Sequence, residues 1–200
     1  IRWIWSRSLT RASWSGTGWM AFTGHRTIGS RPDIWIAHSK HPDSPFPLIA
    51  TEATELEPRF SPDGRWIAYV SDETGRAEVY VRRFHGTPAG SERRIQVSPA
   101  GGDFPVWSPH GSELFYVSMD QKLNAVEVRG FIGDNVPISK PLFRLCPETA
   151  FAGRPGTGES YNAPIDLAPD GRILVRCLAE PPGRVVVWMN WRAQRREAVP

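Results

Sequence analysis

The 200-residue sequence has only two cysteines, Cys146 and Cys177. Two cysteines cannot form the dense disulfide framework of small secreted domains, so a packed apolar core must hold this fold together. The pair could be two buried thiols or one disulfide bridge, and the sequence leaves both open.

A long apolar run and a readable signal peptide are also missing. No segment approaches the roughly 18 consecutive apolar residues of a membrane-spanning helix. Residue 1 is Ile rather than Met, and Ile1–Trp5 has the composition of a strand. We therefore expect a piece of a longer polypeptide, and the cellular compartment is not encoded in this stretch.

The chain has no large excess of charge of either sign. Its formal net charge is +3, and the arginines are spread along the sequence rather than gathered in one basic stripe. Nucleic acid is therefore not an expected partner. The cluster Arg192, Arg195 and Arg196 near the end is expected to be a solvated tail.

Catalytic motifs are absent as well. There is no Gly-x-Ser-x-Gly nucleophile elbow, and the histidines fall in predicted loops or turns without partners at triad or metal spacing. The five are His25, His38, His41, His85 and His110. We expect no catalytic residue, no cofactor and no metal here, so any attached enzyme would have its active site outside these 200 residues.

Two glycine-rich segments imitate nucleotide sites. Residues 153–160 have P-loop spacing, but Glu159 stands where a lysine must neutralise phosphate, and Pro164 breaks any helix that would follow. Residues 16–21 match a dinucleotide fingerprint, yet they fall in a repeated hairpin corner that leads into a strand. Neither segment is expected to bind a nucleotide.

What the chain does contain is a repeated hairpin, which is clearest at residues 60–71. Pro62 presets φ for the second position of a type I turn, Asp63 tolerates the third position, and Gly64 closes the turn without a Cβ clash. This segment therefore predicts two strands joined at a tight corner.

The strand after this corner is apolar on both faces. Trp66, Ala68 and Val70 point to one side, and Ile67 and Tyr69 to the other, as expected for a strand that is packed on each side. The sequence has nine tryptophans, which suit packing between twisted sheets. Those at repeat positions are expected in the core: Trp14, Trp66 and Trp107.

Three further copies of the hairpin occur, at residues 14–22, 107–117 and 167–175. Their corners share the residue types of the first, at Pro109, Gly111, Pro169, Asp170 and Gly171. In the earliest copy Gly16–Gly18 replaces the motif, and in the third copy His110 replaces the aspartate. The copies recur at intervals of about 46 to 60 residues, at or just beyond the spacing of propeller blades.

Further strands complete each repeat. A third strand is predicted at 33–36, 78–81, 124–128 and 185–189, and a fourth at 95–97 and 141–143. We therefore predict an all-β chain, a β-propeller or partial propeller with about four blades of four-stranded antiparallel sheet. The expected blades are approximately 11–50, 57–98, 104–145 and 163–191, with residues 1–10 a remnant strand of a preceding blade.

These residues carry a family resemblance. Residues 57–81, 101–107, 113–116, 125–128 and 190–191 resemble the C-terminal half of TolB-type, WD-repeat-like β-propellers. In particular, they resemble the propellers fused behind eukaryotic-like bacterial serine/threonine kinases. The resemblance covers roughly residues 14–191, although no kinase residues are present.

The resemblance implies a non-catalytic binding or sensor module within a larger bacterial signalling protein. It would be extracytoplasmic or periplasmic if attached to a membrane-anchored kinase. Two alternatives remain: an accessory propeller that gates a prolyl-oligopeptidase-like hydrolase, and a TolB-like periplasmic scaffold.

The last expectation concerns the binding face. In an up-and-down blade, interblade loops share one end with second-to-third-strand loops, and the Pro-Asp-Gly corners share the other. Acidic residues, with Asp33, Glu55 and Glu78 among them, outnumber basic ones at the first end, whereas Arg82 and Arg94 are counted with the basic end. We expect the first end to attract a basic or cationic protein or small ligand. Its candidate residues are Glu57, Asp72, Glu73, Arg76, Asp103 and Asp120.

Overall fold

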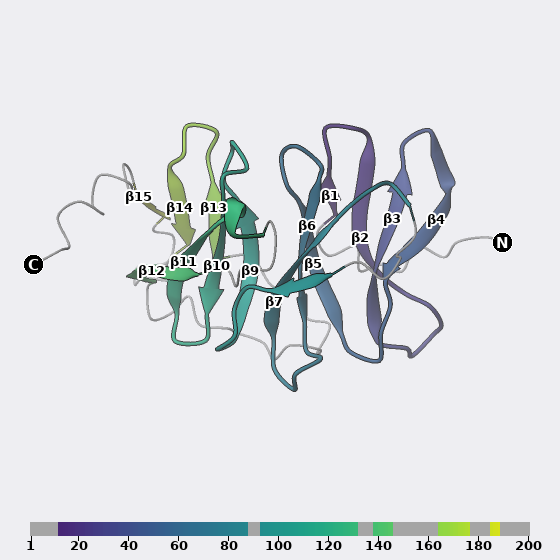
Figure 1. The fold of residues 1–200 in the computed structure, drawn as a ribbon, viewed down its shortest axis with the longest axis horizontal. Helices are drawn as coiled ribbons and strands as arrows, with labels where there is room; N and C mark the ends of the chain where they lie inside the picture. Colours follow the sequence, from purple (N-terminus) through teal and green to yellow (C-terminus); the bar gives the residue numbers. More distant parts are fainter. Residues whose placement is uncertain (1–11, 88–92, 132–137, 146–163, 177–184, 189–200) are drawn as a thin grey trace, which may run out of the picture.

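The computed structural model describes residues 12–87, 93–131, 138–145, 164–176 and 185–188. Apart from loops, these residues form β-strands and one short 3-10 turn, η1 (Val128–Phe131). Figure 1 shows four antiparallel sheets side by side in chain order. The predicted all-β propeller architecture is confirmed.

Each sheet is one blade, in which consecutive strands pair antiparallel. Blade 1 consists of β1 (Ser13–Trp14), β2 (Trp19–His25), β3 (Pro32–His38) and β4 (His41–Ile49). Blade 2 consists of β5 (Glu55–Phe60), β6 (Trp66–Ser71), β7 (Glu78–Arg83) and β8 (Arg94–Gln96). Blade 3 consists of β9 (Gly102–Trp107), β10 (Glu113–Ser118), β11 (Lys122–Glu127) and β12 (Ser139–Arg144). The described part of blade 4 consists of β13 (Ile165–Leu167), β14 (Ile173–Arg176) and β15 (Val185–Trp188).

A tight turn joins the first two strands of every blade. In blade 2, Gly64 has a φ of 70° and donates its N–H to the Ser61 carbonyl at 2.8 Å. Glycines with the same bond and a positive φ close the other three corners: Gly18, Gly111 and Gly171. Only glycine adopts this conformation without a steric penalty, so the recurring type of residue at this position allows the turn to be predicted from the sequence.

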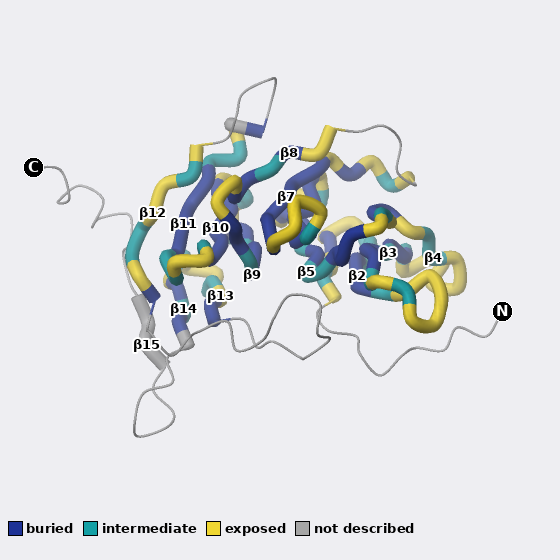
Figure 2. The backbone as a smooth tube through the Cα atoms, turned by 90° about the horizontal axis from the view of Figure 1, so that it is seen from below, coloured by how far each residue is buried: buried dark blue, intermediate teal, exposed yellow. Residues whose placement is uncertain are grey.

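The cores lie between the blades rather than within them. Trp66, Ala68 and Val70 of β6 pack in the core shared with blade 3, whereas Ile67 and Tyr69 pack in the core shared with blade 1. A third core joins blades 3 and 4. The first strands of successive blades contact one another, and Figure 2 shows the buried chain concentrated in the middle strands.

The fourth strand of blade 1 is a feature that the sequence analysis missed. β4 contains Pro42, Pro45 and Pro47, and most of its residues are at least partly exposed. Proline has no N–H to donate to a ladder, so it argues against a strand in the middle of a sheet. An outer edge strand tolerates it, because one side of that strand has no neighbour.

Trp14 is a second departure, because it was expected in the core. Its exposed fraction is 60%, whereas Trp66 and Trp107 are 8% and 7% exposed. Trp107 occupies the equivalent position in the repeat of blade 3, and it packs toward the preceding blade, where its Nε1–H donates to the Arg59 carbonyl of blade 2 at 2.9 Å. Among the described residues no blade precedes blade 1, so Trp14 has no such neighbour.

We expect Trp66→Ala to reduce the free energy of unfolding by about 3 to 5 kcal/mol, because it empties a large volume in the core between blades 2 and 3. Trp14→Ala should change it by no more than about 0.5 kcal/mol, as for an exposed side chain. Urea denaturation of both variants checks this, and similar losses would contradict the packing described here.

Candidate functional site

The alternating connections sort the loops onto two ends of the molecule (Figure 1). At one end, here called the linker end, lie the interblade connections 50–54 and 97–101 and the second-to-third-strand connections 26–31, 72–77 and 119–121. At the opposite end, here called the corner end, lie the tight turns 15–18, 61–65, 108–112 and 168–172. The predicted binding face corresponds to the linker end.

The six candidate residues lie at the linker end or in the strand segments that reach it. The connection after β6 holds Asp72, Glu73 and Arg76, and the turn after β10 holds Asp120. Glu57 and Asp103 lie within β5 and β9, close to where these innermost strands begin. Their role in binding remains a prediction.

Asp72 ties its loop to the neighbouring linker. Its Oδ1 accepts the backbone N–H of Thr54 at 2.7 Å, and its Oδ2 lies 3.6 Å from Nη1 of Arg31 in blade 1. Asp72 therefore joins blade 2 to both the linker and the loop of blade 1, so its charge is partly compensated.

Two arginines counted with the corner end do not belong there. The Arg94 guanidinium pairs with the Glu73 carboxylate at 2.5 Å, which brings its charge to the linker end. Arg82 is buried and donates from Nη1 to the Leu48 carbonyl at 3.1 Å. The separation of charge between the two ends is thus weaker than the sequence count indicated, because long side chains reach across the strands.

The exposed acidic residues at this end are Glu52, Glu73 and Asp120, and the Glu73 side chain is partly covered by its pairing with Arg94. Asp120 pairs with Lys122 at 2.7 Å and accepts a hydrogen bond from the Ser118 hydroxyl at 2.6 Å. These hydrogen bonds hold the pKa of Asp120 below its usual range, so it is ionised at neutral pH.

A buried carboxylate closes the linker between blades 2 and 3. Glu78 has no exposed surface; its Oε1 accepts from Arg76 Nε at 2.7 Å, and its Oε2 accepts from Ser98 Oγ at 2.9 Å and Gly101 N–H at 3.1 Å. Arg76 also donates from Nη2 to the Pro99 carbonyl at 2.5 Å. We call this arrangement of arginine, buried acid and linker carbonyl the interblade clasp.

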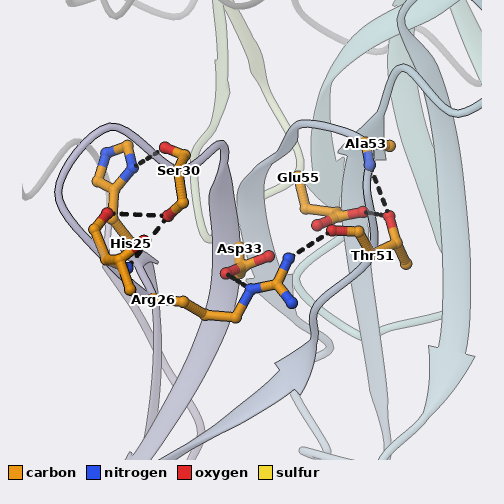
Figure 3. A network of polar contacts seen from close by, with 8 residues as sticks. His25, Arg26, Ser30, Asp33, Thr51, Ala53 and Glu55 are labelled. Carbon is orange, nitrogen blue, oxygen red and sulfur yellow. Dashed lines mark hydrogen bonds and ion pairs between the residues drawn. The ribbon is translucent and has the colours of Figure 1, made fainter.

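The same clasp recurs between blades 1 and 2 (Figure 3). Arg26 donates from Nε to Asp33 Oδ2 at 3.0 Å and from Nη2 to the Thr51 carbonyl at 2.7 Å. Asp33 is fully buried, but its Oδ1 has no hydrogen-bond partner. Ala50 precedes Thr51 just as Ser98 precedes Pro99, so the hydroxyl that completes the other clasp is missing here.

A second buried carboxylate, Glu55, lies beside this incomplete clasp. Its Oε1 accepts a hydrogen bond from the Thr51 hydroxyl, and its Oε2 has no partner. Desolvation by burial raises the pKa of both Asp33 and Glu55 above the usual values for carboxyl groups. The junction between blades 1 and 2 therefore contains two acids and one arginine, whereas the clasp between blades 2 and 3 contains one acid and one arginine.

The sequence analysis counted these acids as surface charges, which is wrong for Asp33, Glu55 and Glu78. A partial signal was present: in blades 1 and 2 an acid lies within the first two residues of the third strand, and an arginine lies two residues before that acid. In blade 1, however, the arginine bonded to the acid is Arg26 rather than Arg31. Lys122 begins the third strand of blade 3, so the pattern is broken there. Burial of an acid at a strand start cannot be inferred from spacing alone.

Backbone strain marks the innermost strands at this end. Glu57 and Phe104 have φ values of 56° and 55°, which side chains other than glycine rarely adopt. Each precedes a proline and lies where its strand bulges, and in β5 the pairing shifts between Leu56 and Arg59. Such conformations cost about 1 to 3 kcal/mol each and concentrate at functional sites.

Among the described residues, no group of three His, Cys, Asp or Glu side chains could hold a metal ion. His38 and His41 face each other across the β3–β4 turn, with ring centroids 6.4 Å apart, but no third such residue joins them. Within the same ranges, no helix is long and apolar enough to cross a membrane.

Several segments weighed in the sequence lie outside the described residues. They are the glycine-rich segment 153–160 with Glu159, the cysteines Cys146 and Cys177, and the arginines Arg192, Arg195 and Arg196.

We expect Glu57→Gly to raise the free energy of unfolding by about 1 kcal/mol, because glycine removes the penalty of a positive φ. Gly64→Ala, at a corner glycine with a φ of 70°, should lower it by at least about 1 kcal/mol. Urea denaturation measures both changes, and a loss of stability in Glu57→Gly would show that the bulge is not strained.

No protein-family profile matches the chain. It is 36% identical over 83 residues to the uncharacterized peptidase YuxL of Bacillus subtilis, a match that covers 41% of this chain and 12% of that protein. It is 41% identical over 94 residues to the uncharacterized protein Atu1656 of Agrobacterium fabrum, covering 46% and 31%. It is 31% identical over 97 residues to the Tol-Pal system protein TolB of Alcanivorax borkumensis, covering 40% and 21%. The chain thus spans less than one third of each relative.

Solved structures give the same picture. A structure assigned to TolB from Agrobacterium tumefaciens matches with a TM-score of 0.54 and 25% identity, covering 70% of this chain and 51% of that one. TolB from Acinetobacter baumannii matches with a TM-score of 0.57 and 18% identity, and the match covers 88% of this chain and 39% of that one. A prolyl endopeptidase matches with a TM-score of 0.57 and 18% identity, and the match covers 90% of this chain and 26% of that one. The last two matches show the fold alone. The chain is therefore a β-propeller segment similar to TolB-like propellers, and none of these matches supports the expected association with a kinase.

Proposed function

We propose that this chain is part of a non-catalytic β-propeller that binds a protein or small ligand at its linker end, within a longer bacterial protein. The strained bulges at Glu57 and Phe104 are the observation that carries this choice of end. Both lie in innermost strands, near the end where those strands begin. Strained bulges of this kind are common at functional sites, where they redirect a side chain. At the corner turns the residues with positive φ are glycines, which adopt it without strain.

The side chains at the linker end suit a partner that is both basic and apolar. Glu52 and Asp120 are exposed acids. Ile28 and Met119, at the tips of second-to-third-strand loops, are exposed apolar residues. Exposed acids guide the approach of a cationic partner, and exposed apolar groups add contact area once it has docked. Because several acids here are already paired, charge alone would not bind strongly.

The similarity to TolB supports a protein-binding role. One relative is a protein of the Tol-Pal system, and the solved TolB structures share this fold. A TolB-like scaffold is therefore better supported than attachment to a serine/threonine kinase, which rests on sequence resemblance alone.

A second candidate function is that of an accessory propeller in a peptidase. The 36% identity to the peptidase YuxL supports it. The described residues offer no metal cluster, and no nucleophile elbow occurs in the sequence, so the catalytic groups would lie elsewhere in the full-length polypeptide. Sequencing the gene on both sides of this region separates the two candidates, because only the second requires a hydrolase domain.

A charge reversal tests the proposed face. In a screen of arrayed peptides rich in Lys, Arg and aromatic residues, we expect Glu52→Lys combined with Asp120→Lys to weaken the best binder at least about tenfold, roughly 1.4 kcal/mol. Arg65→Glu combined with Arg172→Glu reverses exposed charges at two corner turns and should leave the affinity unchanged. Titration calorimetry of each variant gives the comparison, and the opposite pattern would place binding at the corner end.

A further inference from the structure

The two interblade clasps differ in how completely their acids are hydrogen-bonded. In the clasp between blades 2 and 3, both oxygens of Glu78 accept from donors within 3.1 Å. In the clasp between blades 1 and 2, Asp33 Oδ1 and Glu55 Oε2 are buried and accept from none. A buried acceptor without a donor lowers the stability of the folded state. The junction between blades 1 and 2 therefore lacks hydrogen-bond donors that the junction between blades 2 and 3 has.

The charges around the incomplete clasp do not supply what is missing. Arg26 is the arginine bonded to Asp33, and its other described hydrogen bond goes to Thr51. His25 and Glu52 also act on Asp33, with opposite signs, and Asp72 adds negative charge near Glu55. Asp72 itself is paired with Arg31. Two ionised carboxylates here would therefore repel each other behind a single arginine.

We propose that Asp33 and Glu55 share one proton, carried on Glu55 Oε2 and donated to Asp33 Oδ1. A single proton satisfies both unpartnered oxygens at once. Asp33 is the ionised partner because Arg26 is bonded to it, and Glu55 is the neutral partner, whose other oxygen still accepts from the Thr51 hydroxyl. Figure 3 shows Asp33 against the Arg26 guanidinium and Glu55 beside Thr51, and the charge of Asp33 acts on Glu55 across the space between them.

The direction of the pKa shifts agrees with this assignment, since burial raises the pKa of both carboxyl groups. A carboxyl whose pKa is higher in the folded state stabilises that state while it is protonated, and the stabilisation is lost as the pH rises through the folded-state pKa. Deprotonation would leave two negative charges at the seam between blades 1 and 2. The shared proton therefore makes this seam sensitive to pH.

Glu55→Gln tests the proposal, because its amide N–H donates to Asp33 permanently and its carbonyl still accepts from Thr51. Unfolding in urea is measured at constant ionic strength from about pH 5 to about pH 8. The unfolding constant of the wild type should rise by up to about tenfold per pH unit over the range in which the folded state still holds the proton and the unfolded state has released it. Glu55→Gln should lack this increase, since His25 and all other titrating groups are retained.

Glu78→Gln is the matched control at the junction between blades 2 and 3. It should lower stability and keep the pH slope of the wild type. Equal slopes in the wild type and Glu55→Gln would overturn the proposal.

Infrared spectroscopy gives a readout that a purely structural role would not move. The carbonyl stretch of a protonated carboxyl should be present at neutral pH in the wild type and in Glu78→Gln, and absent in Glu55→Gln. Absence of this band in the wild type would overturn the proposal. So would a rise in melting temperature with calcium or manganese ions that Glu55→Gln abolishes, because a metal ion would then occupy the place of the proton.

Discussion

The structure depends on strands that are apolar on both faces. β6 is buried along its whole length, with three side chains packed toward blade 3 and two toward blade 1. No single sheet can bury both faces of such a strand, so each blade is stable only against its neighbours. The order and spacing of the blades follow from this requirement, and the interblade seams are where the free energy of folding is decided.

The polar groups at the linker end close these seams. Each interblade clasp joins an arginine from a loop of one blade to a carbonyl of the linker that leads to the next. Asp72 adds a third connection, between its own loop and Thr54 of the preceding linker. Loops held in this way lose little freedom when a partner docks, which favours binding by a preorganised face. The same contacts also reduce the net charge that the face presents.

The elements that could be predicted from sequence are those set by local chemistry. The corner at Pro62–Gly64 follows from turn preferences, and the two faces of β6 follow from alternation. Features that depend on neighbours could not be predicted in this way. β4 tolerates its prolines only because it is an edge strand, and the exposure of Trp14 depends on which blade lies beside it. The buried acids were misjudged for the same reason, since their burial is created by the linker that covers them.

The two ends of the blades also differ in how closely the repeats follow one another. At the corner end, all four turns keep a glycine at positive φ and the same backbone hydrogen bond. At the linker end, the residue at or next to the start of the third strand changes from Asp33 to Glu78 to Lys122, and the linker residue that completes one clasp is alanine in the other. The corner turns are needed for folding in every blade, so the same residue types can recur at all four of them. The linker end differs from blade to blade and also contains strained backbone and incompletely bonded acids, and these departures from the repeat are why we place the proposed binding face there.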